Sequence, residues 1–197
     1  MHSLRLWVLA AFFLFPLSMP FAVRAGEPMA QLSASINEFV TIMSNTSVAE
    51  LQAAGLPEKA RQLVFSRFDF SEMTRRSLGS HWKSLNQGEQ REFVAALTHR
   101  LLVFYGKTVR STGNETIQFM REVRDGKQAS VETKVISGDG DQTPIDYRLH
   151  DVNGEWMVYD VVIANVSLVN NYRSQFERVI AKSSVHDLLR QMKNQGS

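Results

Sequence analysis

Residues 156–176, WMVYDVVIANVSLVNNYRSQF, are the most informative part of the chain for its fold. Its first half predicts a strand with Trp156, Val158, Asp160 and Val162 on one face and Met157, Tyr159, Val161 and Ile163 on the other. Both faces therefore carry large apolar side chains, and the strand has to be covered on two sides. A sheet with helices on one face and an internal cavity on the other would cover it, and so would an ordinary two-sided core.

Working outward, the chain up to about Arg110 is predicted to be helical. Asp69 with Glu72, and Asn86 with Glu89, are capping-box patterns that open helices. The second pattern begins the longest helix, whose apolar stripe contains Phe93, Leu97, Leu101 and Phe104 or Tyr105.

After Thr112 the pattern indicates four strands, at 116–124, 128–136, 145–150 and 155–163. The dipeptides Asp125-Gly126 and Asn153-Gly154 favour type I′ hairpins between them. Residues 168–182 and 185–192 return to helix. We therefore expect one α+β domain over residues 26–197, in which a helical N-terminal half packs on a curved antiparallel four-stranded sheet, with C-terminal helices and an internal apolar pocket.

The N-terminus reads as an export signal. Arg5 precedes an apolar run over residues 6–17, and Val23-Arg24-Ala25 has small residues where a signal peptidase needs them. We expect residues 1–25 to be removed after Ala25, since the apolar run is shorter than the roughly 20 residues of a membrane span. An uncleaved anchor is the alternative.

Charge and cysteine content exclude several classes of protein. Removing residues 1–25 takes away Arg5 and Arg24, which leaves 20 basic residues, 22 less 2, against 20 acidic ones. This neutral balance, without a basic cluster interleaved with aromatic residues, argues against nucleic acid as a partner. The sequence has no cysteine, which excludes disulfides and cysteine-based metal or redox chemistry.

Residues 156–176 also resemble a known signature, W-x-V-Y-D-V-V-I-x-x-V-S-L-V-x-N-Y-R-x-Q-F, that of the MlaC or toluene-tolerance family of periplasmic phospholipid carriers, which includes hopanoid-associated relatives. A second block, FDFSEMTRRSLGSHWKSLNQGEQREFVAALTHRLLVFYG at residues 68–106, is similar to the family's F-D-F…L-G…W…Q-R-x-x-F…L…Y pattern. The two blocks occur in the family's order and span over half of the exported chain.

The resemblance implies a cone-like α+β fold related to nuclear transport factor 2, and a role that is not enzymatic. It implies a periplasmic protein that shuttles a phospholipid, or a related lipid such as a hopanoid, between the inner and outer membranes. The implied partners are the lipid, an inner-membrane MCE-type subunit of an ABC transporter complex and an outer-membrane lipoprotein complex. No cofactor is expected.

Large apolar side chains from the helices, the sheet and its following helix are the candidates for lining the lipid pocket. They are Phe65, Phe70, Met73, Leu78, Trp82, Leu97, Leu101, Tyr105, Tyr147, Trp156, Val158, Val162, Val166, Leu168, Val169 and Phe176. Spacing alone does not separate those that touch lipid from those that form ordinary core.

Asp160 is the one acid in the apolar strand. A carboxylate in a hydrophobic cup can act as a general base, so an enzyme that uses Asp160 on a small apolar molecule is an alternative to the carrier. Burying an unpaired charge is costly, however, and Tyr172 or Arg173 on the next helix could satisfy it. We expect a structural buried pair of Asp160 with Arg173. A protein-interaction module with an ordinary core is a third reading.

No metal site is expected. The five histidines lie in separate elements without a second ligand at helical spacing. The sequence Gly138-Asp139-Gly140-Asp141 is acidic, but it lacks the remaining oxygen donors of a calcium loop and is expected to be a hairpin turn.

Overall fold

The computed structural model describes residues 27–47, 49–51, 55–109 and 115–194, with the side chains of 105–109 left out. The predicted signal peptide and its cleavage site lie outside these ranges. The helices are α1 (Pro28–Ser44), α3 (Glu58–Arg67), α4 (Phe70–Leu78), the 3₁₀ helix η1 (Gly79–Ser84), α5 (Gln87–Val109), α6 (Leu168–Ile180) and α7 (Val185–Asn194). Among the described residues, no helix is long and apolar enough to cross a membrane.

The strands form one antiparallel sheet in sequence order: β1 (Thr116–Asp125), β2 (Gln128–Ile136), β3 (Gln142–Val152), β4 (Glu155–Ile163) and β5 (Val166–Ser167). The predicted α+β fold with a curved antiparallel sheet is confirmed, but the sheet has five strands and not four. The two-residue β5 was missed because it is too short to show alternation.

The two predicted hairpins differ in their turns. Asn153 and Gly154 both have positive φ, as a type I′ turn requires. In the β1–β2 hairpin, Asp125 pairs with Gln128, so the turn residues are Gly126 and Lys127. Only Gly126 has positive φ, which is the pattern of a type II′ turn, and the predicted type I′ turn is wrong there.

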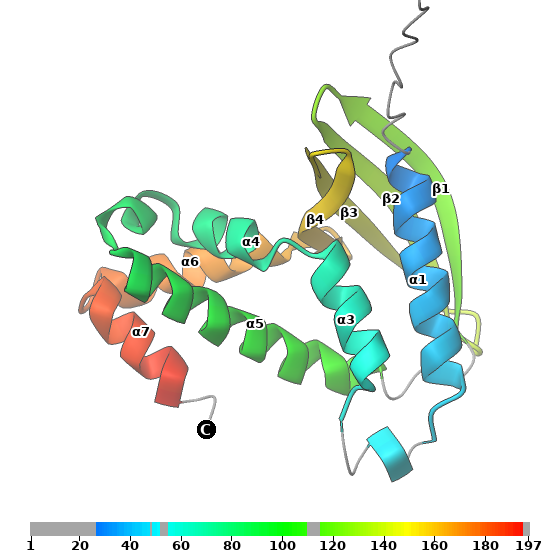
Figure 1. The fold of residues 1–197 in the computed structure, drawn as a ribbon, viewed down its shortest axis with the longest axis horizontal. Coiled ribbons are helices and arrows are strands. Elements are labelled where there is room, and N and C mark those ends of the chain that lie inside the picture. The colour runs from blue at the N-terminus through cyan, green and yellow to red at the C-terminus, as the bar shows by residue number, and fades with distance from the viewer. Residues whose placement is uncertain (1–26, 48, 52–54, 110–114, 195–197) are drawn as a thin grey trace, which may run out of the picture.

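The elements form two groups joined along β4 (Figure 1). In one, α1 lies over the sheet and contacts β1, β2 and β4. In the other, α4, α5, α6 and α7 pack on one another. Arg67 fastens α3 to the first group, since its Nη1 donates to Gln31 Oε1 of α1 at 2.9 Å and to the Trp156 carbonyl of β4 at 2.8 Å.

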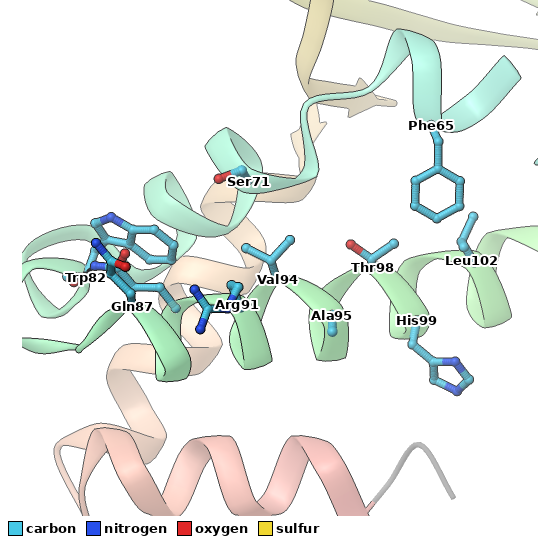
Figure 2. A pocket seen from close by; sticks show the side chains of 11 residues that line it. Phe65, Ser71, Trp82, Gln87, Arg91, Val94, Ala95, Thr98, His99 and Leu102 are labelled. Atoms are coloured by element: carbon cyan, nitrogen blue, oxygen red, sulfur yellow. Dashed lines mark hydrogen bonds between the residues drawn. The ribbon is translucent and has the colours of Figure 1, made fainter. Parts of the chain in front are cut away.

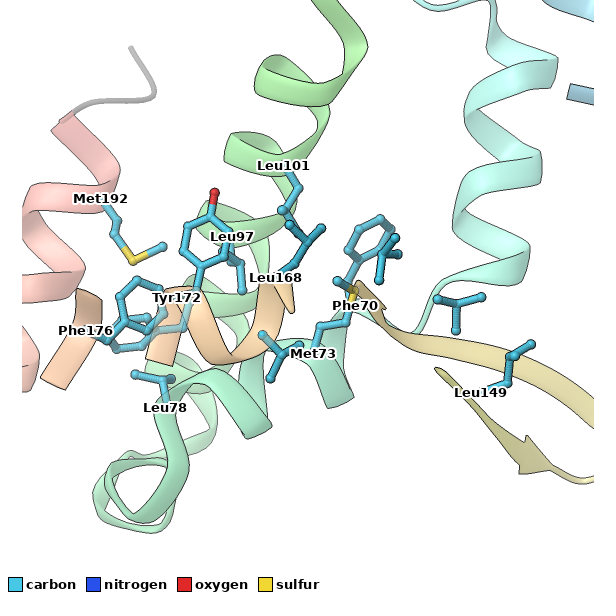
Figure 3. Close-up of a cluster of buried hydrophobic side chains, with 14 of the residues drawn as sticks. Phe70, Met73, Leu78, Leu97, Leu101, Leu149, Leu168, Tyr172, Phe176 and Met192 are labelled. Carbon is cyan, nitrogen blue, oxygen red and sulfur yellow. The ribbon is translucent and has the colours of Figure 1, made fainter. Parts of the chain in front are cut away.

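The core is continuous between the two groups. Its fully buried members include Trp156, Phe93, Leu78 and Leu97. Figure 3 shows side chains from α4, α5, α6 and α7 converging, with Leu149 of β3 at the sheet end of the cluster. Burying apolar area of this kind is the main source of the fold's stability.

Both predicted helix starts are confirmed. The Asn86 Oδ1 accepts a hydrogen bond from Glu89 N at 3.0 Å, and the Glu89 Oε2 accepts one from Asn86 N at 2.9 Å, which is a complete capping box. Asp69 accepts from Glu72 N at 2.8 Å, but the Glu72 side chain binds Arg75 and Arg76 instead of closing the box.

A β-bulge in β4 changes which side chains face the core. Asp160 pairs with Arg148, and Val158 pairs with Leu149, the residue that directly follows Arg148 on β3. Two steps along β4 thus match one step along β3, so Tyr159 is an extra residue. Directly paired residues share a face, and neighbours along a strand do not. Asp160 therefore faces away from Val158, and the predicted placement of Trp156, Val158, Asp160 and Val162 on one face is wrong. Val161, paired with Tyr147, replaces Val162 in the core.

Candidate functional site

Two open grooves, of about 770 and 550 Å³, meet along the side of α5 that faces α3 and α4. The first runs beside α5 to η1, and the second reaches the β3–β4 hairpin, where Val152 and Met157 line it. Phe65, Val94 and Thr98 line both grooves, so the two are continuous. In Figure 2, Phe65 of α3 points across the gap towards Thr98 and Leu102 of α5.

The floor of the first groove is a stripe on α5 formed by Val94, Thr98 and Leu102. These residues recur every four positions and so lie on one face of the helix. Each directly follows a member of the core stripe, Phe93, Leu97 and Leu101, all of which are buried. The groove stripe was missed because the sequence prediction followed the core stripe alone. The apolar residues at positions 94 and 102 are the signal that could have revealed a wider stripe.

A break between two helices places aromatic rings at the junction of the grooves. α3 ends at Arg67, and the following residue, Phe68, has an extended backbone and forms a bridge with Val158. Asp69 N then donates to the Val158 carbonyl at 2.9 Å. The Phe70 ring lies 5.4 Å from that of Phe65 and 5.9 Å from that of Phe68. Phe65 keeps 48% of its surface exposed, although such a large apolar residue is normally buried.

Of the residues predicted to line a pocket, Phe65, Phe70 and Trp82 line these grooves. Most of the others are buried in the packed core and line neither groove: Met73, Leu78, Leu97, Leu101, Trp156, Val158, Leu168, Val169 and Phe176. Tyr147 packs against that core, and desolvation raises the pKa of its hydroxyl to about 12. A lipid contact for these core residues stays a prediction.

Three further predicted residues fall elsewhere. Val162 is buried on the sheet face opposite Val158, and Val166 is 54% exposed on β5. The side chain of Tyr105 lies outside the described part of the structure. The pocket was predicted to be internal, between sheet and helices. These grooves are open and lie mainly between α5 and the α3–α4–η1 segment, and the second one extends to the β3–β4 hairpin.

Asp160 is 2% exposed and is held by three hydrogen bonds. Its Oδ2 accepts from Arg148 Nη1 at 3.0 Å and from Ser167 Oγ at 2.7 Å, and its Oδ1 accepts from Val169 N at 3.1 Å. The carboxylate therefore also sits at the N-terminus of α6, where the helix dipole favours negative charge.

The predicted pairing of Asp160 with Arg173 is wrong. The ion-pair partner is Arg148, the cross-strand neighbour on β3, because the bulge turns Asp160 to the face that carries Arg148. The Arg173 guanidinium lies against Gly79 instead, 3.0 Å from where a Cβ would stand on that glycine. Gly79 has a positive φ of 56°, so a side chain there would be strained as well as crowded.

The electrostatic character differs between the grooves. Arg91 and His99 line the first groove, and no acidic side chain among the described residues does. The second is lined by Asp69 and Glu155. Asp69 Oδ2 lies 3.0 Å from His150 Nε2, and Glu155 Oε2 lies 3.7 Å from Arg67 Nη1. No group of three or more acids and histidines that could hold a metal occurs among the described residues.

These features define a small α+β protein with open, mainly apolar grooves and a charge difference between them. The chain belongs to the MlaC protein family, which matches it over residues 33–194. The resemblance stated on the two sequence blocks is thereby confirmed.

Three known proteins illustrate the relationship. The toluene tolerance protein Ttg2D of Pseudomonas putida is 30% identical over 89 residues, which are 45% of this chain and 41% of that protein. The intermembrane phospholipid transport system binding protein MlaC of Haemophilus influenzae is 25% identical over 126 residues, 61% and 58% of the two chains. The matches thus span about half the length of these curated relatives.

A solved structure shares the fold. The phospholipid-binding protein of Ralstonia solanacearum, solved in complex with a phospholipid, superposes with a TM-score of 0.77. The superposition covers 87% of this chain and 97% of that protein, at 22% sequence identity.

Proposed function

We propose that this protein is a periplasmic lipid carrier that takes a phospholipid, or a related lipid such as a hopanoid, by its acyl chains and moves it between the inner and outer membranes. Membership of the MlaC family supports the proposal, as do the names of the relatives, one a phospholipid transport binding protein and one solved with a phospholipid.

The observation that carries the proposal is the meeting of two apolar grooves at Phe65. Their volumes of about 770 and 550 Å³ both fall within the roughly 300 to 1,000 Å³ of ordinary ligand sites. An aromatic side chain that is 48% exposed between them loses its contact with water if an acyl chain lies along it. Val94 and Thr98 extend the same surface along α5.

The free energy of chain transfer dictates how such a carrier works. Full removal from water is worth about 0.8 kcal/mol per CH₂, so two chains with about 30 methylenes represent roughly 24 kcal/mol. That exceeds the ceiling of roughly 18 to 21 kcal/mol for noncovalent affinity. Release into water would be very slow, whereas transfer to a bilayer, where the chains are already dry, is nearly balanced. Loading and unloading therefore require docking to a membrane partner.

The proposed partners come from the family resemblance: an MCE-type subunit of an inner-membrane ABC transporter complex, and an outer-membrane lipoprotein complex. Export through the predicted signal peptide would place the protein between the two.

The geometry of Asp160 gives no support to the enzyme alternative. A general base must come within hydrogen-bond reach of its substrate. Asp160 lines neither groove, and all three of its hydrogen bonds are made within the protein.

The test is the lipid content of protein purified without detergent, measured by solvent extraction and mass spectrometry. We expect up to about one lipid per chain in the wild type. Phe65→Arg should lose most of this lipid, because it places a charge where both grooves meet, and it should stay folded because Phe65 is half exposed. Val166→Arg is the matched control, since Val166 is 54% exposed, close to the 48% of Phe65, but lines neither groove.

Wild-type protein that is folded, carries no lipid and takes none from vesicles would contradict the proposal. Equal lipid in Phe65→Arg and the control would mean that the chains lie elsewhere in the molecule.

A further inference from the structure

The two ends of the first groove differ, because large apolar side chains line the end near α3, together with Thr98 and His99, whereas Gln87 and Arg91 line the end near η1. Figure 2 shows Trp82, Gln87 and Arg91 gathered at the η1 end, while Phe65, Thr98 and Leu102 lie at the far end. An indole suits the boundary between apolar and polar surroundings, because its ring is apolar and its N–H is a donor. The groove therefore has the amphipathic character of a lipid molecule.

Arg91 is the side chain at that end with spare binding capacity. It is exposed, and it forms no ion pair with any described residue, whereas the acids before and after it on α5 are engaged: Glu89 lies 2.9 Å from His186, and Glu92 lies 3.0 Å from Lys193. A guanidinium matches a phosphate with two parallel hydrogen bonds.

Three of the backbone N–H groups in the first turn of α5 already have acceptors. Gln90 N donates to the Asn86 carbonyl at 2.9 Å. The N–H groups of Gly88 and Glu89 already donate to Asn86 Oδ1, at 2.8 and 3.0 Å. The side chain of Gln90 is also committed, because its Nε2 donates to the carbonyls of Trp82 and Leu85 at 3.2 Å. The side chain of Gln87 also lines this end and offers a neutral amide donor, so Arg91 is the positively charged group there that can bind an anion.

A lipid with its phosphate in the second groove, and not near Arg91, would be disfavoured by charge. The second groove is lined by Asp69 and Glu155, which already have partners within the protein, His150 and Arg67. A phosphate placed there would meet two carboxylates and no unengaged cation among the lining residues. The chains, which carry no charge, can extend past Phe65 to Phe68, Phe70 and Met157 in this groove.

Building on the function proposed above, we infer that Arg91 binds the phosphate of the lipid headgroup, with Trp82 at the boundary and the acyl chains running along Val94 and Thr98 towards Phe65. Arg91 is thus a specificity-determining residue that selects phosphate-bearing lipids over uncharged lipids with the same chains. The groove provides the affinity, and Arg91 sets the orientation.

The test is a competition between two lipids that differ in the phosphate group. Lipid-free protein is incubated with vesicles that contain dioleoylphosphatidylethanolamine and dioleoylglycerol in equal amounts, and the bound lipids are quantified by mass spectrometry. The wild type should favour the phospholipid by about two- to fivefold, the range for one solvent-exposed charged contact. Arg91→Gln should bring the ratio close to one by lowering the amount of bound phospholipid, with the amount of bound dioleoylglycerol not reduced. Arg91→Lys should keep part of the preference.

Arg178→Gln is the matched control, because Arg178 is an exposed arginine on α6 that lines neither groove. Calorimetry with inorganic phosphate tests whether Arg91 binds a free phosphate ion as well as the phosphate of a lipid. We expect the lipid-free protein to bind no inorganic phosphate. A wild type without preference, an Arg91→Gln variant that keeps it, or phosphate binding that depends on Arg91 would each overturn the inference. Failure of the wild type to load either lipid would instead contradict the carrier function itself.

Discussion

Asp160 is a single residue whose charge is used for structure. Its carboxylate joins three parts of the chain: Arg148 on β3, the Ser167 hydroxyl at the end of β5, and the Val169 N–H in the first turn of α6. The two donors at α6 would otherwise be buried without partners, which is costly. Ser167 is also the N-cap of α6 and accepts from Asn170 N at 3.1 Å. Asp160 therefore fixes where α6 leaves the sheet.

Replacing Asp160 by Asn should lower stability by roughly 1 to 3 kcal/mol, because the amide has one acceptor oxygen and presents an NH₂ group to a converging donor. Urea denaturation at neutral pH measures the loss. Arg148→Gln should cost less, since the Arg148 side chain is 45% exposed and water can replace it. The lipid content of folded Asp160→Asn should stay normal. A variant with wild-type stability would remove the structural role argued for this carboxylate.

Among elements, β4 illustrates what the sequence predicts and what it does not. Its bounds, Glu155–Ile163, were predicted correctly, because the apolar run is flanked by the Asn153-Gly154 turn on one side and by Ala164 and Asn165 on the other. The bulge at Tyr159 was not predicted. A bulge shifts the pairing by one residue and so exchanges the two faces of the strand. Because both faces of β4 carry apolar side chains, its sequence pattern is the same with or without the bulge. The error in the partner of Asp160 follows from it.

In α4, Glu72 is held by Arg75 and Arg76, whose hydrogen bonds and positive charge lower the pKa of its carboxyl group from 4.5 to about 2. A group whose pKa is lowered by folding adds stability above its unfolded pKa and loses it as the pH falls towards the folded value. Glu72→Gln should therefore lower the free energy of unfolding by about 1 kcal/mol above pH 4.5. This value is small because the Arg75 side chain is half exposed and water screens the pair. The difference in unfolding free energy from wild type should shrink as the pH falls from 4.5 to about 2.

Urea denaturation of both proteins at a series of pH values measures this difference. Glu58→Gln is the control, because Glu58 pairs with Arg61 in the same i,i+3 spacing but is fully exposed, and we expect no measurable effect there. A constant difference between Glu72→Gln and wild type down to pH 3 would contradict the linkage.

At the scale of the whole molecule, the fold was more predictable than the site. Periodicity and capping signals are local, so the helix starts at Asp69 and Asn86 and the order of strands could be read directly. Whether an apolar residue lines a groove depends on the packing of distant elements. Leu97 and Thr98 are neighbours on α5, yet the first is core and the second lines both grooves, because α3 and α4 lie over one face only.

The grooves at the surface of α5 lead to a prediction about the stability of the entire fold. A ligand that binds only the folded state stabilises it by mass action, by about 2.7 kcal/mol when its free concentration is 100 times the Kd. For a domain of this size that corresponds to a rise of roughly 5 to 10 °C in Tm. We expect this rise when lipid-free protein is loaded from phospholipid vesicles and melted in a calorimeter. Val166→Arg should show the same rise and Phe65→Arg little of it. An identical Tm for loaded and lipid-free wild type would mean that lipid does not bind specifically to the grooves of the folded state. That result is expected if the apolar residues serve only as core.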